Sequence, residues 1–104
     1  MADEDFGLVA ERTLQALEAA LDDVDGDFDI DRGDGKVAVV FDDGTHFIIN
    51  RQSASSQLWL AEPGGGWHFD RSGADWICDK RGVTLRAALA ELLSAKLGSP
   101  VELG

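Results

Sequence analysis

The sequence predicts an α+β fold, a two-layer sandwich with an N-terminal and a C-terminal helix on one face of an antiparallel sheet of about six strands. Apolar residues recur at steps of three and four near both ends of the chain, which is typical of amphipathic helices. Between these two regions lie short strand-like segments separated by turn residues. The connections are too short for parallel crossovers, so we expect the strands to run antiparallel.

The first helix is expected over residues 6–24, where Asp3 or Asp5 can cap its start and Gly26 can end it. Its apolar side chains, spaced to form one stripe, are Phe6, Val9, Ala10, Leu14, Leu17, Leu21 and Val24. A second helix is expected after the capping residue Thr84, and it should end near Gly98. No internal repeat or linker interrupts the chain, so we expect residues 1–104 to form a single domain.

Between the helices, the predicted strands occupy residues 27–32, 36–41, 45–50, 57–61, 66–70 and 75–79. Strand alternation sends Trp76 and Cys78 to the core and Trp59 to the open face of the sheet. An exposed tryptophan on an open face suggests a binding surface. The alternative is that Trp59 rests flat on its neighbours and is half-buried.

The charge of the chain is concentrated at one end. The 104 residues include 20 acidic and 9 basic side chains, for a net charge of −11. Residues 1–43 hold 14 acidic and three basic residues, whereas residues 44–104 hold six of each. This asymmetry suggests a cation or a basic partner and argues against nucleic acid. The alternative is an acidic surface that serves only solubility.

Several other classes of protein are disfavoured. No apolar run reaches the roughly 18 residues that a membrane helix needs, and the acidic start is unlike a signal peptide, so a cytoplasmic protein or a mature organellar one is expected. Cys78 is the only cysteine, so an internal disulfide is excluded. We interpret this residue as a buried structural thiol. His46 and His68 lack a metal-binding spacing, and no enzyme motif is present.

The acidic residues form a pattern that suits a hard cation. One sector of the first helix, about 60° wide, holds Glu4, Glu11, Glu18, Asp22 and Asp25. The strand that follows places Asp27, Asp29 and Asp31 at alternate positions. Crowded carboxylates repel one another and are good ligands for hard metal ions. The run is not an EF-hand, because Ile30 and Lys36 stand where that motif needs Gly and Glu, so weak and open sites are expected.

The chain also resembles the frataxin family, in its bacterial CyaY form, from about residue 6 to 103. The resemblance rests on the acidic run 21–31 and on the segments Ile49-Asn50-Arg51-Gln52, Gln57-Leu58-Trp59-Leu60-Ala61, His68-Phe69-Asp70 and Asp75-Trp76-Ile77-Cys78-Asp79. It implies the same sandwich fold, weak iron binding, and a role in iron–sulfur cluster assembly. The resemblance implies docking on the cysteine desulfurase as iron donor, regulator or both, with the iron–sulfur scaffold protein as a possible further partner.

The resemblance also implies site residues. The iron-binding and basic-partner residues would be Glu11, Glu18, Asp22, Asp23, Asp25, Asp27, Asp29 and Asp31. The partner-binding face of the sheet would consist of Asn50, Arg51, Gln52, Gln57, Trp59 and His68. Ala19 and Val24 depart from residues common in relatives, a glutamate and an aromatic respectively. We expect a non-enzymatic iron chaperone or regulator that is monomeric or oligomerises with iron; the alternatives are a ferroxidase and a metal-independent acidic interaction module.

Overall fold

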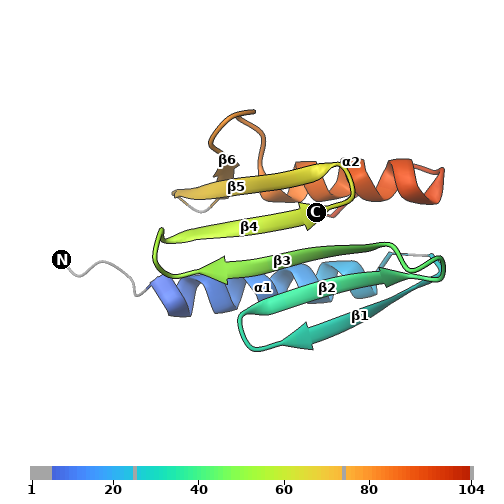
Figure 1. Cartoon of the computed structure of the whole chain (residues 1–104), viewed down its shortest axis with the longest axis horizontal. Helices are drawn as coiled ribbons and strands as arrows, with labels where there is room; N and C mark the ends of the chain where they lie inside the picture. The colour runs from blue at the N-terminus through green and yellow to red at the C-terminus, as the bar shows by residue number, and fades with distance from the viewer. Residues whose placement is uncertain (1–5, 25, 74, 104) are drawn as a thin grey trace.

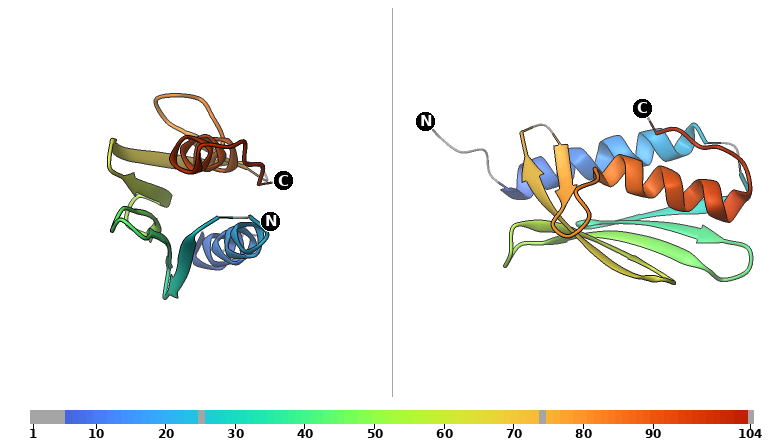
Figure 2. Two further views of the ribbon diagram at one scale, coloured as in Figure 1. Left: turned by 90° about the vertical axis from the view of Figure 1, so that its right-hand side faces the viewer. Right: turned by 90° about the horizontal axis from the view of Figure 1, so that it is seen from above.

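Two helices and six strands follow one another in the computed structural model, which describes residues 6–24, 26–73 and 75–103. In chain order they are α1 (Phe6–Asp22), β1 (Phe28–Gly33), β2 (Lys36–Phe41), β3 (His46–Gln52), β4 (Gln57–Glu62), β5 (Gly65–Ser72), β6 (Asp75–Cys78) and α2 (Leu85–Leu97). The strands form one antiparallel sheet in which each lies beside its neighbours in sequence, from β1 at one edge to β6 at the other (Figure 1). Figure 2 shows both helices on the same face of this sheet. The predicted α+β sandwich is therefore confirmed.

The two helices end where local hydrogen bonds stop them. We predicted that the first helix extends to residue 24, but α1 ends at Asp22, because the next two amides bond three residues back rather than four. Thr84 caps α2 as predicted, accepting a hydrogen bond from the amide of Ala87, and Gly98 ends it in the left-handed conformation at φ 75°. The predicted capping residues Asp3 and Asp5 lie outside the described residues.

The core lies between the sheet and the two helices. The helices contribute buried leucines at successive turns, and the strands contribute alternate residues such as Leu58, Leu60 and Phe69. Cys78 is buried, as the strand alternation predicted. Because every second strand residue points toward the helices, the remaining residues form the open face of the sheet.

Trp76 joins the end of the sheet to the first helix. Its side chain is 5% exposed, and its indole N–H donates a hydrogen bond of 2.9 Å to the hydroxyl of Thr13 on α1. The ring of Phe6 meets it edge-on, with 6.0 Å between the ring centroids. This contact brings β6 and α1 together although they lie far apart in sequence.

An ion pair attaches the end of α2 to the turn between β2 and β3. The ammonium group of Lys96 lies 2.5 Å from the carboxylate of Asp43, which also accepts a hydrogen bond from the amide of Thr45. The hydrogen bond from Lys96, which has the largest effect, and that from Thr45 hold the pKa of Asp43 well below its usual range.

Lys96→Met should lower the melting temperature slightly at neutral pH, and the difference from the wild type should disappear in acid. Since the folded-state pKa of Asp43 is depressed, the ion pair stabilises the protein fully above about pH 5 and progressively less as pH falls below about 4. Thermal unfolding at several pH values measures this, with Lys80→Met as a control that loses the same charge. A difference that persists in acid would mean that Lys96 stabilises through its alkyl chain.

Candidate functional site

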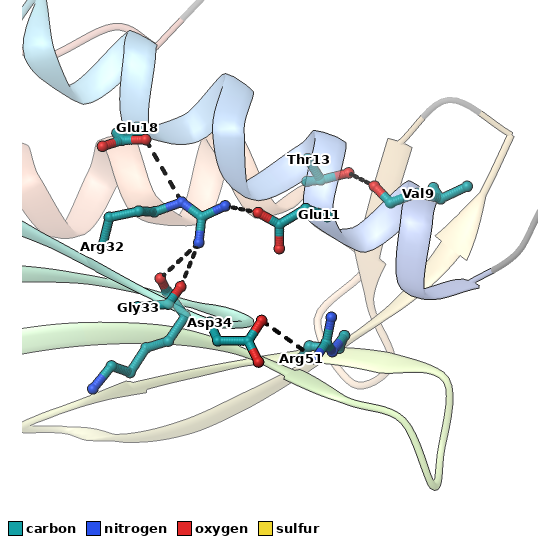
Figure 3. A network of polar contacts seen from close by, with 9 residues as sticks. Val9, Glu11, Thr13, Glu18, Arg32, Gly33, Asp34 and Arg51 are labelled. Atoms are coloured by element: carbon teal, nitrogen blue, oxygen red, sulfur yellow. Dashed lines mark hydrogen bonds and ion pairs between the residues drawn. The ribbon is translucent and has the colours of Figure 1, made fainter.

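Arg32 stands between the acidic residues of α1 and β1. Its guanidinium contacts the carboxylate of Glu11, and its Nε lies 3.6 Å from the carboxylate of Glu18 (Figure 3). The same group donates to the backbone carbonyls of Gly33, at 2.6 Å, and Lys36, at 3.2 Å. Two of the predicted metal ligands are thus already paired with a cation that the chain supplies.

Strand alternation explains why Arg32 meets the helix and its acidic neighbours do not. Ile30 and Arg32 are partly buried on the side of β1 that faces α1, whereas Asp29 and Asp31 are exposed. Asp29 pairs with Val40 and Asp31 with Ala38 on β2, at the edge of the open face. The acidic surface therefore has two parts. The glutamates on α1 have Arg32 as their counter-ion, whereas the aspartates on β1 have no counter-ion among the contacts of the described residues.

Two open hollows at the end of α1 are each lined by two acidic residues. Asp22 and Asp29 line one open hollow of about 350 Å³ between the end of α1 and the start of β1. Asp23 lines a second hollow, of about 310 Å³, together with Glu102 from the C-terminal segment. Asp27 is exposed on the connection to β1, and Asp25 lies outside the described residues. The sequence pattern missed Glu102 because only the fold places it at the same hollow as Asp23.

This arrangement can bind a hard cation only loosely. Within residues 6–24, 26–73 and 75–103, no three His, Cys, Asp or Glu side chains gather closely enough to hold a metal ion. A pair such as Asp22 and Asp29 offers carboxylate oxygens on an open surface, where water would complete the coordination of the ion. The chemistry available is therefore exchangeable oxygen ligation of a hard cation.

The open face of the sheet carries most of the predicted partner-binding residues. Asn50, Trp59 and His68 are paired in register across β3, β4 and β5, so they form one row. The ring of Trp59 stacks on that of His68, with 4.3 Å between centroids and 17° between planes. Its indole N–H donates to the side-chain oxygen of Gln57 at 2.9 Å. Trp59 thus lies on the open face as predicted, but it is half-buried, as the alternative interpretation held.

A second row of polar side chains lies beside the first. Gln52 pairs with Gln57, which pairs with Asp70, and the amide of Gln57 donates to the carboxylate of Asp70 at 3.0 Å. Arg51 is the exception among the predicted partner residues. It alternates with Asn50 and Gln52, so its side chain leaves the sheet on the other side.

Three residues that the sequence pattern did not select also contribute to these surfaces. They are Arg32, Asp70 and Asp79, and a carboxylate oxygen of Asp79 lies 3.9 Å from Nδ1 of His68. Arg32 carried a signal, as the only base in the run 27–32, and Asp70 had outward parity. The position of Asp79 beside His68 follows from the pairing of β5 with the segment after β6, which sequence alone does not reveal.

Comparison with known proteins gives one family match and several similar structures. A sequence profile described as the frataxin-like domain matches residues 1–99. Frataxin from Psychromonas ingrahamii, of the CyaY protein family, is 28% identical, with a TM-score of 0.89 over 100% of this chain and 99% of that one. Trimeric frataxin from the yeast Saccharomyces cerevisiae, complexed with ferrous iron, is 23% identical, with a TM-score of 0.69 over 95% of this chain and 90% of that one. Within the described part of this chain, neither helix is both long and apolar enough to cross a membrane.

Proposed function

The chain belongs to the frataxin family, and from this premise we propose that it binds iron at its acidic surface and serves iron–sulfur cluster assembly. The observation that carries the proposal is the open hollow at the end of α1, which is lined by Asp22 from the helix and Asp29 from β1. The yeast family member complexed with ferrous iron adds support. In this role the protein acts either as an iron donor or as a regulator. It carries iron as cargo and does not turn over a substrate.

Weak and reversible iron binding suits the carboxylates present. Ferrous and ferric ions are hard enough to accept oxygen ligands, and an open pair of carboxylates leaves most of the coordination shell to water. A donor must release its ion, so a loosely held ion is an advantage for delivery.

Replacing both Asp22 and Asp29 with asparagine should weaken ferrous iron binding by at least about tenfold, because it removes two charges from one hollow. Anaerobic calorimetric titration with ferrous iron measures the dissociation constant. The matched control is Asp75→Asn with Asp79→Asn, which removes the same charge near the opposite edge of the sheet. Equal weakening by both pairs would mean that iron responds to net charge and not to this hollow.

The partner in this proposal is the cysteine desulfurase, with the scaffold protein as a second one. The acidic residues of α1 and β1 would attract a basic surface, and the row of Asn50, Trp59 and His68 would supply the contact on the open face. The β1 part of the acidic surface lies in the same sheet as this row, since β1 lies beside β2 and β2 beside β3, whereas α1 lies on the other side of the sheet (Figure 2). A partner that reaches around the β1 edge would contact both surfaces.

A metal-independent interaction module is the second candidate. It is supported by the pairing of Glu11 and Glu18 with Arg32, because these two carboxylates already have a counter-ion from the chain itself. The two candidates differ in one measurement, the affinity for the desulfurase with and without a chelator. An iron-dependent partner would bind more weakly in chelator, whereas a pure interaction module would bind equally well.

A further inference from the structure

Arg32 is held more firmly than an ordinary surface arginine. Its guanidinium contacts two carboxylates on α1 and donates to two backbone carbonyls, Gly33 O and Lys36 O (Figure 3). The side chain is only 19% exposed, and the contacts come from one helix and from both strands of the first hairpin. A guanidinium stays protonated at every pH at which a protein folds, so this cation is permanent.

A metal ion at Glu11 or Glu18 would have to compete with this arginine. Displacement would leave a partly buried guanidinium without its acidic partners, which is unfavourable. Binding without displacement would place a divalent cation close to a fixed positive charge, which repels it. Both routes disfavour metal at these two glutamates.

We propose that Arg32 is a built-in counter-ion that excludes metal from Glu11 and Glu18 and confines cations to the carboxylates beyond them, at Asp22 and Asp29. This inference rests on the proposed iron binding and assigns which of the acidic residues take part in it. Glu18 lies one helical turn before Asp22, so the two carboxylates could share an ion if Arg32 were absent. The arginine thus sets both the position and the weakness of the site.

The test is a titration with Mn²⁺, followed through the electron paramagnetic resonance signal of the free ion. Arg32→Gln should tighten Mn²⁺ binding on the order of tenfold at low salt, since one repelling charge is removed and Glu18 becomes available. Lys80→Gln is the control, because it removes the same charge just after β6, near the opposite edge of the sheet, and should change affinity less than about twofold. Equal tightening by the two variants would overturn the inference.

A second comparison keeps the inference testable if Arg32→Gln fails to fold. In the wild-type background, Glu18→Gln should weaken Mn²⁺ binding less than about threefold, whereas Asp22→Asn should weaken it about tenfold. If Arg32→Gln does fold, adding Glu18→Gln to it should remove most of the gain in Mn²⁺ affinity. If Glu18→Gln weakens wild-type binding as much as Asp22→Asn does, the arginine does not exclude metal, although iron binding itself would stand. If neither the wild type nor Arg32→Gln binds Mn²⁺ or ferrous iron, the proposed function fails instead.

Discussion

Replacing Trp76 with alanine should lower the free energy of unfolding by about 3–5 kcal/mol. The side chain is almost completely buried, packs edge-on against Phe6, and donates a hydrogen bond to Thr13. Alanine would leave a cavity between β6 and α1 and would remove the direct attachment of the sheet edge to the first helix. Urea denaturation followed by circular dichroism measures the change in midpoint and slope.

Two variants separate the contributions of Trp76. Trp76→Phe keeps an aromatic ring but loses the N–H donor, so it should cost about 1–2 kcal/mol. Thr13→Val removes the acceptor and should cost a similar amount, while the double variant should cost less than the sum because both changes break one hydrogen bond. A midpoint for Trp76→Ala within experimental error of the wild type would contradict the assignment of this residue to the core.

The effects of Trp59→Ala should be opposite to those of Trp76→Ala, with a large loss of partner binding and a smaller loss of stability. We expect binding to the proposed partner, the cysteine desulfurase, to weaken about 30-fold, or roughly 2 kcal/mol, which is the effect of losing an aromatic hot spot. Stability should fall by only about 1–2 kcal/mol, since the ring is half-buried and its main contact is the stack on His68. Binding titrations and denaturation curves on the same samples measure both quantities.

Leu8→Ala provides a matched control for this prediction. Leu8 is the most exposed large apolar side chain of the described residues, at 49%, and it lies on α1, away from the open face of the sheet. Leu8→Ala should leave binding to the desulfurase unchanged if that partner contacts the row of Asn50, Trp59 and His68. A binding defect as large for Leu8→Ala as for Trp59→Ala would show that the partner docks on the helices.

The sequence predicted the fold well because the relevant signals are local. Helical and strand periodicity located all eight elements, and alternation placed Leu58, Phe69 and Trp76 on the buried side. The end of α1 was misplaced by two residues because Val24 continues the apolar stripe, whereas hydrogen bonding had already tightened into a turn. Periodicity reports where a side chain could be buried and does not report where the backbone stops being helical.

The candidate site was less predictable because its contacts join distant parts of the chain. Strand alternation indicates that Arg32 points away from Asp31. It cannot indicate that Glu11 on α1, 21 residues earlier in the sequence, lies within contact of the Arg32 side chain. The stack of Trp59 on His68 likewise depends on the register between β4 and β5. In the sequence the acidic residues therefore form one group, whereas the fold divides them into those with a counter-ion and those without one among the contacts of the described residues.

The position of β1 at the edge of the sheet gives its aspartates a second consequence. An edge strand presents unpaired backbone groups to which another copy of the chain could add a strand, and charged side chains there are a common protection against such aggregation. Asp29 and Asp31 carry that charge along β1, while β6 at the other edge is only four residues long. We therefore expect the same carboxylates that would attract cations to oppose the addition of a second copy of the chain at the β1 edge.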